Sequence, residues 1–515
     1  MLDYDARKIL SAASAASATI GARTSVPRAP RQLSTAALIA ASETTRPAMS
    51  PIVLAGLVRF AESTMIALIG TIIYGAYVLS AEAFSWPYAF AIVGIASLTI
   101  FAFQAVDIYQ VHAFRRPVNQ IARLISAWTL VFLIATAISF FLKYNETFSR
   151  VWLLTFWAVG LAALLASRAI LYVLVRRWMR DGRLTRRTVI VGGGAPGESL
   201  IAALKTQQDS DVRVVGVFDD RNDERAPISC AGLEKLGTVD DFVEFARRTR
   251  IDLVIFSLPI SAENRLLQML KKLWVLPVDI RLSAHSNRLR FRPRSYSFIG
   301  SVPVLDLFDR PIADWDVVMK WLFDKIVGGL ALLVALPVMA IIAVAIKLDS
   351  RGPVLFKQKR YGFNNDLIEV YKFRSMYVDQ CDATASKLVT KGDPRITRIG
   401  RFIRKASLDE LPQLFNVVFK GNLSLVGPRP HAVHAKAAAR LYDEAVDGYF
   451  ARHRVKPGVT GWAQINGWRG ETDTQEKIQK RVEYDLYYIE NWSVLFDLYI
   501  VAMTPIALLK TENAY

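Results

Sequence analysis

Four long apolar segments follow one another in the first third of the chain. They cover residues 52–80, 86–106, 124–142 and 151–175. Each segment is at or close to the roughly 20 residues that a helix needs to cross the hydrocarbon core of a bilayer. The pattern therefore predicts four transmembrane helices that form a bundle over residues 51–180.

The charges next to these segments indicate their orientation. Arginines gather at positions 115–123 and 176–180, whereas the first loop carries only Glu82. Because Lys and Arg are enriched in cytoplasmic loops, both termini of the bundle are expected in the cytoplasm. Arg59 and Glu62, near the start of the first segment, are interpreted as a helix end at the lipid headgroups, in preference to a functional intramembrane pair.

The segment before the first apolar stretch has a different composition. Residues 1–50 repeat Ala, Ser and Thr with scattered Arg, and they show no apolar periodicity. They also lack the continuous apolar core of a signal peptide. We therefore expect a disordered arm over residues 1–50.

From residue 183 the chain alternates between short β-rich runs and helical runs. Residues 188–191, 213–218 and 252–257 read as strands, and residues 198–205 read as a helix. Strands that alternate with helices are typical of a parallel α/β domain. We expect this domain to cover residues 183–300.

The first turn of this domain carries a candidate nucleotide-binding motif. Gly192, Gly194 and Gly197 satisfy the G-x-G-x-x-G pattern between a predicted strand and a predicted helix. Asp219 follows the next strand, at the position where an acid can hold a ribose. A glycine-rich turn can also serve only to pack a helix on a strand, so binding of NAD or another nucleotide and a purely structural turn both stay open.

A fifth apolar stretch, residues 326–346, decides the topology of the rest of the chain. It is long enough to span a membrane, but Pro337 interrupts it and favours a sharp break. Basic residues flank it on both sides: Lys320 and Lys325 before it, and Lys347, Arg351, Lys357, Lys359 and Arg360 after it. Since both flanks then belong on the same face, we expect a re-entrant helix. The alternative, a kinked fifth span, would put the following domain outside the cell.

The overall composition favours a basic membrane protein. The chain has 64 Lys and Arg against 46 Asp and Glu, a net charge of +18, and 52% of its residues are hydrophobic. This combination is unusual for a soluble nucleic-acid binder, so we expect no nucleic-acid partner. The two cysteines, Cys230 and Cys381, lie far apart, which excludes a disulfide scaffold and a Cys-rich metal module.

The most basic region follows the fifth apolar stretch and predicts an anionic partner. Residues 347–405 hold 14 Lys and Arg but only 6 Asp and Glu. Such a surface often attracts acidic lipid headgroups. In segments 371–376 and 392–395, however, aromatic, Pro and Gly residues fix where the guanidinium groups point, which favours specific phosphate binding.

The candidate chemistry lies in residues 404–413. Ser407 and Glu410 have the spacing of a capping box, with Asp409 as a first-turn acid. Pro412 instead favours the first helical position, which puts the two acids just before the helix. In both arrangements the acids lie at the positive end of a helix dipole, where carboxylates stay ionised and phosphates bind. Because adjacent helical residues point about 100° apart, one acid is expected to attack while the other holds a metal.

Three runs of sequence around these acids resemble one family. They read SLDELPQ at 407–413, followed by Asn416, then GNLSLVGPRP at 421–430 and KPGVTGWAQ at 456–464. The family is that of the polyprenyl-phosphate hexose-1-phosphate transferases, bacterial sugar transferases that begin exopolysaccharide assembly. The similarity is strong over residues 316–515 and looser over the preceding segments.

Two further runs, residues 467–474 and 481–489, are similar to the branch of this family that acts on UDP-glucose, although glucose and galactose are not distinguished. Two positions depart from the family pattern. Asn365 stands where the family usually has Gly, and Ile368 stands where it usually has Phe. Since Asn tolerates the left-handed conformation, only the local turn is affected.

The resemblance implies a mechanism. Asp409 would be the nucleophile that attacks the sugar-linked phosphorus of a UDP-sugar, expels UMP and forms a covalent phosphosugar intermediate. Undecaprenyl phosphate would attack in turn. Glu410 would hold Mg²⁺. The residues expected to contact phosphates are Arg404 and Arg429 first, and then Lys372, Arg374 and Arg395.

The resemblance also implies an architecture, a membrane α/β protein. Its expected parts are the arm 1–50, the four-helix transmembrane bundle 51–180, the Rossmann-like domain 183–300 and the region 316–515, an α-rich catalytic domain anchored by the re-entrant helix. We expect a multi-pass protein of the bacterial inner membrane whose catalytic domain faces the cytoplasm among membrane lipids. Whether it forms a homodimer is left open.

Other functions fit the sequence less well. A ligand-gated channel or transporter would leave residues 350–490 unexplained, and no selectivity-filter loop is evident. An NAD-dependent membrane oxidoreductase would use the turn at 192–197. His431 and His434 share one helical face, but with no third ligand nearby a surface role is favoured over metal binding.

Overall fold

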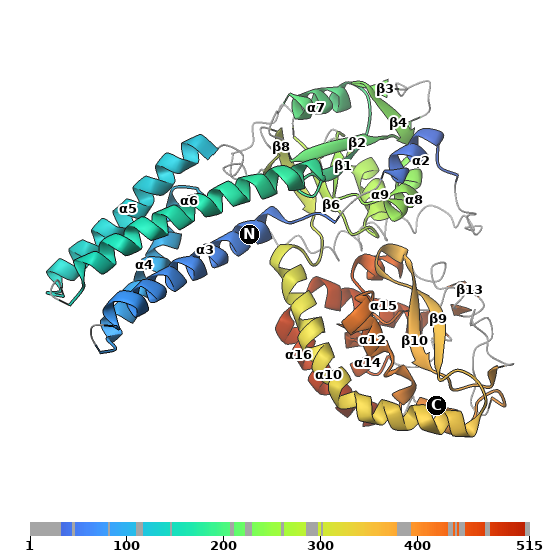
Figure 1. Cartoon of the computed structure of the whole chain (residues 1–515). Helices are drawn as coiled ribbons and strands as arrows, with labels where there is room; N and C mark the ends of the chain where they lie inside the picture. The colour runs from blue at the N-terminus through green and yellow to red at the C-terminus, as the bar shows by residue number, and fades with distance from the viewer. Residues whose placement is uncertain are drawn as a thin grey trace. The chain divides into compact units, whose positions relative to one another are not determined.

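The computed structural model describes residues 32–43, 47–80, 83–109, 117–144, 147–206, 211–221, 229–258, 262–284, 297–299, 302–378, 393–430, 436–437, 440–441, 449–468 and 474–509 (Figure 1). The chain divides into two compact units, Thr44–Arg186 and a second one that joins Met1–Glu43 to Arg187–Tyr515. His431, His434 and Cys381 lie outside the described residues.

The unit Thr44–Arg186 consists of long helices at the four apolar segments. They are α3 (Pro51–Ile73), which continues as the π-helical turn η1 (Tyr74–Val78), α4 (Trp86–Ala105), α5 (Pro117–Phe141) and α6 (Arg150–Arg180). α3 packs against α4 and α6, and α5 packs against the same two helices. By length and apolar composition all four are able to cross a membrane, as the sequence predicts.

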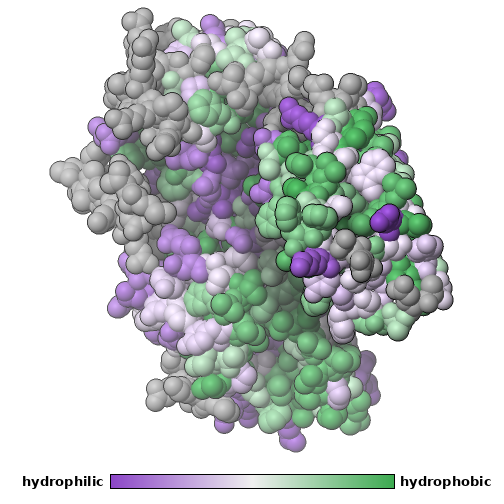
Figure 2. Space-filling model, turned by 90° about the vertical axis from the view of Figure 1, so that its left-hand side faces the viewer, coloured by the Kyte–Doolittle hydropathy of each residue, from purple (hydrophilic) through white to green (hydrophobic). Residues whose placement is uncertain are grey.

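Aromatic side chains fill the space between these helices. Trp128, Trp152 and Phe156 are fully buried, and Gly160 allows the close approach, since a Cβ there would lie 2.5 Å from the Trp128 ring. The outer faces are apolar as well: Phe90 and Phe141, for example, are 73% and 81% exposed. Broad apolar areas are visible in Figure 2. Apolar surface of this extent suits contact with lipid.

Glu62 does not occupy an exposed helix end. Its carboxylate is buried and receives hydrogen bonds from Arg168 (2.9 Å) and from the Tyr109 hydroxyl (3.0 Å). Its cationic partner is Arg168 of α6, which lies far away in the sequence and which the sequence interpretation did not identify. The pair joins α3 to α6 inside the bundle.

The second unit begins with an eight-stranded sheet in the order β3-β4-β2-β1-β5-β6-β8-β7. The strands are β1 (Arg186–Val191), β2 (Val212–Phe218), β3 (Ser229–Cys230), β4 (Leu233–Gly237), β5 (Leu253–Phe256), β6 (Asp279–Ser283), β7 (Ser297–Ile299) and β8 (Val302–Phe308). β5 pairs in parallel with β1 and β6, and β2 pairs in parallel with β4. β8 pairs antiparallel with β6 and β7, so the sheet extends beyond the predicted end at residue 300.

Helices cover both faces of this sheet. α7 (Ala195–Lys205) packs on one face, and α8 (Val239–Arg248) and α9 (Glu263–Leu273) pack on the other. The alternation of side chains along β1 explains the two cores, since Ile190 joins the α7 side while Val189 and Val191 join the opposite one. Burial on both faces accounts for the continuous apolar runs of the strands.

Part of the segment that we expected to be a disordered arm is a helix. α2 (Thr35–Ser42) starts at the N-cap Ser34 and packs on the sheet domain, with Leu33 and Ala37 buried in its core. The low-complexity composition hides this helix, because most of the residues that dock it are alanines: Ala36, Ala40 and Ala41 pack on the same core. The expectation for residues 1–50 is therefore wrong over this stretch.

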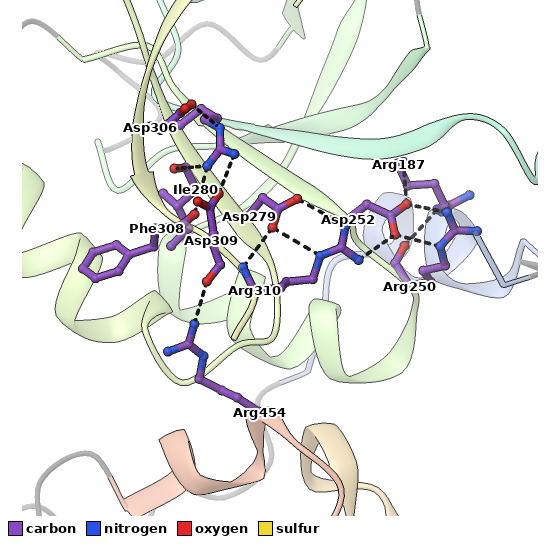
Figure 3. A network of polar contacts seen from close by, with 11 residues as sticks. Arg187, Arg250, Asp252, Asp279, Ile280, Asp306, Phe308, Asp309, Arg310 and Arg454 are labelled. Atoms are coloured by element: carbon purple, nitrogen blue, oxygen red, sulfur yellow. Dashed lines mark hydrogen bonds and ion pairs between the residues drawn. The ribbon is translucent and has the colours of Figure 1, made fainter. Parts of the chain in front are cut away.

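Acids and arginines alternate where the parallel strands begin (Figure 3). Asp252 accepts hydrogen bonds from the Arg250 guanidinium (2.6 Å) and from the Arg187 N–H (2.9 Å). Asp279 binds Arg310 in the same way, with two guanidinium contacts of 3.2 Å. Hydrogen-bonded charge of this kind keeps buried carboxylates paired.

The remaining part of the second unit is built around one long helix and several short elements. These are α10 (Asp314–Asp349), β9 (Leu355–Tyr361), η5 (Phe363–Asn365), β10 (Leu367–Phe373), α11 (Arg398–Lys405), η7 (Leu408–Glu410), α12 (Gln413–Phe415), η8 (Asn416–Lys420), β11 (Ser424–Val426), β12 (Lys436–Ala437), β13 (Arg440–Leu441), η9 (Tyr449–Arg454), β14 (Gly458–Thr460), α14 (Trp462–Ile465), α15 (Gln475–Glu490) and α16 (Val494–Leu509). β9 and β10 form an antiparallel hairpin, and β11 pairs in parallel with β14. In the hairpin turn Asn365 has φ +66°, which confirms the left-handed conformation expected there.

α10 is a single helix that runs through Pro337, and Figure 1 shows its axis turning partway along. Both of its ends are held by neighbouring elements. Near its start Lys320 binds Asp497 of α16 (2.5 Å), and at its end Arg374 donates to the carbonyl of Ser350 (2.8 Å). Proline removes one internal hydrogen bond and so weakens the helix where it turns.

Candidate active site

Asp409 and Glu410 lie in the short 3₁₀ turn η7, just ahead of α12. Ser407 precedes them in the left-handed conformation (φ +56°), and its side chain makes no capping hydrogen bond. Pro412 is the N-cap of α12. Of the two arrangements that the sequence allows, the one that places the acids before the helix is therefore correct, because Pro412 suits a helix start.

The Glu410 carboxylate is committed to two cations. Its Oε1 accepts hydrogen bonds from Lys372 Nζ (2.8 Å) and from Arg429 Nη2 (2.5 Å). Burial alone would raise the pKa of Glu410, but the charges of Arg429 and Lys372 outweigh burial and hold the pKa far below its ordinary value. Glu410 therefore stays ionised throughout the physiological pH range.

The Asp409 carboxylate is in a different state. It is 9% exposed, and within the described part of the chain no hydrogen bond reaches it. Burial raises the pKa of Asp409, while the charges of Lys372 and Arg404 act in the opposite direction. A carboxylate that is buried, surrounded by positive charge and free of hydrogen bonds keeps its lone pairs available for attack.

A third cation, Arg360 of β9, belongs to the same site. Its guanidinium donates to the side-chain oxygen of Gln358 (2.7 Å) and to the carbonyl of Pro430. Burial, together with the charge of Arg429, lowers the pKa of Arg360 to about 10, so it remains charged at neutral pH. The hollow at this point is lined by Arg360, Val370, Glu410, Gln413, Arg429, Pro430, Gly458 and Val459.

Two guanidinium nitrogens near the acids are buried without a hydrogen-bond partner among the described residues, Nη1 of Arg404 and Nη1 of Arg429. Leaving a buried donor unsatisfied is unfavourable, by about 1–3 kcal/mol for each group. Planar guanidinium groups match the geometry of phosphate oxygens. The arrangement therefore suits an anionic ligand with several oxygens.

Asn416 fixes the strand that carries Lys372. It is fully buried, accepts the N–H of Tyr371 (3.0 Å) and donates to the carbonyl of Glu369 (2.7 Å). The amide thus replaces a strand partner for β10 and holds the backbone on either side of residue 370. The direction of the Lys372 side chain follows from this contact.

Two of the predicted phosphate ligands have other partners in the structure. Arg374 is 3% exposed and donates to the carbonyls of Arg351 (2.6 Å) and Ser350 (2.8 Å), so it caps the end of α10. Arg395 donates hydrogen bonds to the Asp393 carboxylate through Nε (2.9 Å) and Nη2 (2.6 Å). Their position in a basic run made them candidates, but only the fold shows which arginines are already engaged.

Sequence reasoning missed several residues of the site. In the sequence Arg360 reads only as part of a basic flank, and no pattern assigns a role to Gln358, Gln413 or Asn416. The sequence does hold a signal for Gln358 and Arg360. They are two positions apart on a strand, so their side chains lie on the same face of it.

The acids of η7 do not by themselves provide a complete set of metal ligands. Among the described residues no group of three or more His, Cys, Asp or Glu side chains is close enough to bind a metal. Mg²⁺ is commonly bound by one or two carboxylates together with substrate phosphates and water. Glu410 fits such a site when phosphate oxygens and water complete the coordination.

The glycine-rich turn is closed by its own neighbours. Gly192 and Gly194 have positive φ values of 101° and 79°, and a Cβ on Gly197 would lie 2.8 Å from the Gly192 carbonyl, so all three glycines are required by geometry. Asp219 accepts the Gly193 N–H (2.7 Å) and binds Arg221 (2.7 Å). Arg221 in turn donates to the Gly193 carbonyl (2.6 Å).

Two family descriptions match the chain. Residues 315–511 match the family described as bacterial sugar transferase, and residues 104–284 match the CoA-binding domain. The first match contains α10 and both acids of η7.

Curated proteins are similar to most of the chain. The undecaprenyl-phosphate glucose phosphotransferase of Komagataeibacter xylinus is 42% identical over 65% of this chain and 61% of its own length. The UDP-glucose:undecaprenyl-phosphate glucose-1-phosphate transferases of Xanthomonas campestris pv. campestris and Escherichia coli (strain K12) are 34% and 35% identical over 86% of this chain. The matches cover 90% and 94% of those two proteins. The chain therefore belongs to the bacterial sugar transferases, among the polyprenyl-phosphate hexose-1-phosphate transferases.

Proposed function

We propose that this protein transfers glucose-1-phosphate from UDP-glucose to undecaprenyl phosphate and releases UMP. The observation that carries the proposal is a pair of unlike carboxylates beside two guanidinium groups. Among the described residues Asp409 accepts no hydrogen bond, Glu410 binds two cations, and Nη1 of Arg404 and of Arg429 has no hydrogen-bond partner. Relatives that cover most of the chain carry the name of this activity. We propose that this transfer is the first membrane step of exopolysaccharide or capsule biosynthesis, and its support is a relative named exopolysaccharide production protein PSS.

The proposed reaction has two displacements at one phosphorus atom. In the first, a carboxylate oxygen of Asp409 attacks the sugar-linked phosphorus, and the bond to the bridging oxygen breaks, so that UMP leaves with the electron pair. In the second, a phosphate oxygen of undecaprenyl phosphate attacks the same phosphorus, and the bond to Asp409 breaks. The carboxylate is thereby restored, and no oxidant or reductant is needed.

Four cations are placed to bind the negative oxygens of the donor. Arg404 and Arg429 each offer an Nη1 atom that has no hydrogen-bond partner within the described ranges, and Arg360 and Lys372 contribute charge beside Glu410. Because these groups are held in a largely buried site, they stabilise the charge that develops on phosphate oxygens without having to reorganise. Glu410 would hold Mg²⁺, and the bound ion would neutralise pyrophosphate charge and help the leaving oxygen depart.

We further propose that α10 enters the membrane and returns on the cytoplasmic side. Its support is that both ends bind the same domain: Asp324 accepts hydrogen bonds from Ser424 (2.9 Å) and the Leu425 N–H (3.0 Å), and Arg374 caps the far end. A 36-residue helix with both ends on one domain cannot also lie straight across a bilayer. Location in the bacterial inner membrane with a cytoplasmic site is part of this proposal.

The sheet domain is proposed as a site for a nucleotide at Gly192, Gly194, Gly197 and Asp219, and NAD is one candidate. The matching family description, CoA-binding domain, supports a nucleotide-containing ligand. Such a ligand would have to displace Arg221 from the turn or be bound by it. Whether a ligand binds can be tested separately from transfer, by a thermal shift of the purified protein with NAD or coenzyme A.

One assay tests the main proposal. Purified protein in detergent is incubated with UDP-glucose, undecaprenyl phosphate and Mg²⁺, and UMP is measured. Release that requires both the lipid and Mg²⁺ supports the transferase, and replacing UDP-glucose by UDP-galactose shows which hexose is accepted. If UMP does not appear but NADH is consumed, the oxidoreductase alternative is favoured instead.

A further inference from the structure

The loop that carries Arg429 has few backbone N–H groups with which it can be held in place. It reads Gly427-Pro428-Arg429-Pro430, and a proline has no backbone N–H. The two prolines stiffen the loop, but they cannot donate the hydrogen bonds that usually hold a loop against its surroundings. The Gly427 N–H donates to the Thr460 carbonyl (2.9 Å), and from Pro428 to Pro430 the loop is held through its carbonyl groups.

Three consecutive carbonyls are bound by donors from elsewhere in the fold. The Pro428 carbonyl accepts the Gly458 N–H (3.0 Å), the Arg429 carbonyl accepts Nη2 of Arg452 (2.8 Å), and the Pro430 carbonyl accepts Arg360. Of these donors, Arg360 already lines the site and the Gly458 N–H is backbone. Arg452 is the side-chain donor whose task has not been assigned.

The Arg452 side chain is buried and held by its neighbours. It lies in η9, is 1% exposed, and its Nη2 is 2.5 Å from Asp485 of α15. Its guanidinium also packs over the Tyr449 ring at 5.4 Å. A fully buried ion pair is a weak source of stability, because desolvation opposes the attraction. Its value here is better explained by the bond to the Arg429 carbonyl.

We propose that Arg452 is a positioning residue for the transfer reaction, which holds the backbone of Arg429 so that the Arg429 guanidinium stays against Glu410. The proposal rests on the proposed function, since it takes Arg429 as a ligand of the donor phosphates. Arg452 binds the backbone of Arg429 and the side chain of Asp485. Its effect passes through Arg429, whose Nη2 contacts Glu410 at 2.5 Å and whose Nη1, without a partner in the part of the chain that the structure describes, can bind a phosphate oxygen.

A double-mutant cycle separates this role from a merely structural one. Four proteins are compared for UMP release: the natural protein, Arg452→Gln, Arg429→Lys and the double variant. We expect Arg452→Gln alone to lower kcat by about 10- to 100-fold, the range that follows from a small misplacement of a catalytic group. In the Arg429→Lys background the same change should lower kcat by less than about 3-fold, since the group to be positioned has gone.

Controls address folding. Arg250→Gln removes another largely buried arginine–aspartate pair, Arg250–Asp252 (2.6 Å), and should leave kcat unchanged. If Arg452→Gln does not yield a folded protein in detergent, Asp485→Asn enters the same cycle; it loosens the Arg452 guanidinium without removing it, and its smaller effect must also vanish in the Arg429→Lys background. Equal losses in both backgrounds, or no loss in the natural background, overturn the proposal.

A second readout keeps this inference separate from the proposed function. If the natural protein releases no UMP from UDP-glucose, the function is wrong, and hydrogen exchange then tests the anchoring alone. Arg452→Gln should speed exchange of the Gly458 amide, which binds the Pro428 carbonyl in the anchored loop. Unchanged exchange at Gly458 in a folded variant would show that Arg452 does not hold the loop.

Discussion

In two regions of the molecule an aspartate lies among arginines. The regions differ in how completely these charged groups are hydrogen-bonded to one another. At the glycine-rich turn, Asp219 accepts the Gly193 N–H and binds Arg221, which itself closes back on the Gly193 carbonyl. At η7 the balance is incomplete, since Asp409 has no hydrogen bond among the described residues and two nearby guanidinium nitrogens are unpartnered. A closed network stabilises a fold, whereas an open one leaves groups for a ligand.

The largest expected difference between the two regions is in turnover. Asp409→Asn should lower UMP release by about 10⁴-fold or more, because an amide cannot replace the attacking carboxylate. Asp219→Asn should leave it within about 3-fold, since that acid is committed to its own turn. Initial rates at saturating UDP-glucose measure both. Comparable losses in the two variants would remove the distinction between the regions.

Substitution of the arginine in each region should affect kcat/KM in the same direction, with a smaller difference between the two regions. Arg429→Ala removes a positioned donor for phosphate oxygens and should lower kcat/KM by about 10²- to 10³-fold. Arg221→Ala opens the glycine-rich turn and should change kcat/KM by no more than about 3-fold. Steady-state kinetics over a range of UDP-glucose concentrations check this pair. A large effect of Arg221→Ala would instead connect the sheet domain to the chemistry.

The same comparison shows what the sequence could predict. The four apolar segments, the strands β1, β2 and β5 and the acids at η7 follow from periodicity and motif, because each is encoded locally. The strands β3, β4, β6, β7 and β8 were not predicted. Partner choice is not local. Arg374 and Arg429 belong to the same basic region by composition, yet one caps α10 and the other binds Glu410, and only tertiary packing decides between them.

The helix α2 was missed for a related reason. Residues 35–42 have little amphipathic pattern, and their helix forms where Ser34 caps it and Ala37 docks on the sheet domain. Tertiary contact overrides weak local preference in such a segment. The pair Glu62–Arg168 joins residues more than 100 positions apart, which no local pattern could indicate.

The pH dependence of turnover tests the state of Asp409. Attack requires the ionised carboxylate, and burial raises the pKa of Asp409, so turnover should fall with decreasing pH at a higher pH than for an ordinary aspartate. Glu410 should not contribute to this limb, because Arg429 and Lys372 keep its pKa low. The pH profile of kcat measures the pH at which turnover falls, and folding is checked at each pH. An acid limb at or below the ordinary aspartate pKa of about 3.9 would contradict this state.

The smallest expected effect is on stability, and it has opposite signs in the two regions. Burial raises the pKa of Asp409, so its charge is unfavourable in the fold above that pKa, and Asp409→Asn should raise Tm at pH 7. Burial would also raise the pKa of Asp219, but the hydrogen bonds from Arg221 and Gly193 outweigh burial and lower it; Asp219→Asn should therefore lower Tm at pH 7. Both differences should shrink as the pH falls through the pKa of each acid. Thermal melts at several pH values measure them, and equal signs would refute the contrast.

The central claim is that Asp409 carries the sugar phosphate between donor and lipid. Its most direct test is mass spectrometry of protein that is quenched after incubation with UDP-glucose and Mg²⁺ in the absence of undecaprenyl phosphate. The account predicts a hexose-phosphate adduct on the peptide that contains Asp409, lost on addition of the lipid and absent from Asp409→Asn. An adduct on a different side chain, or none in a preparation that is proven to turn over, would contradict it.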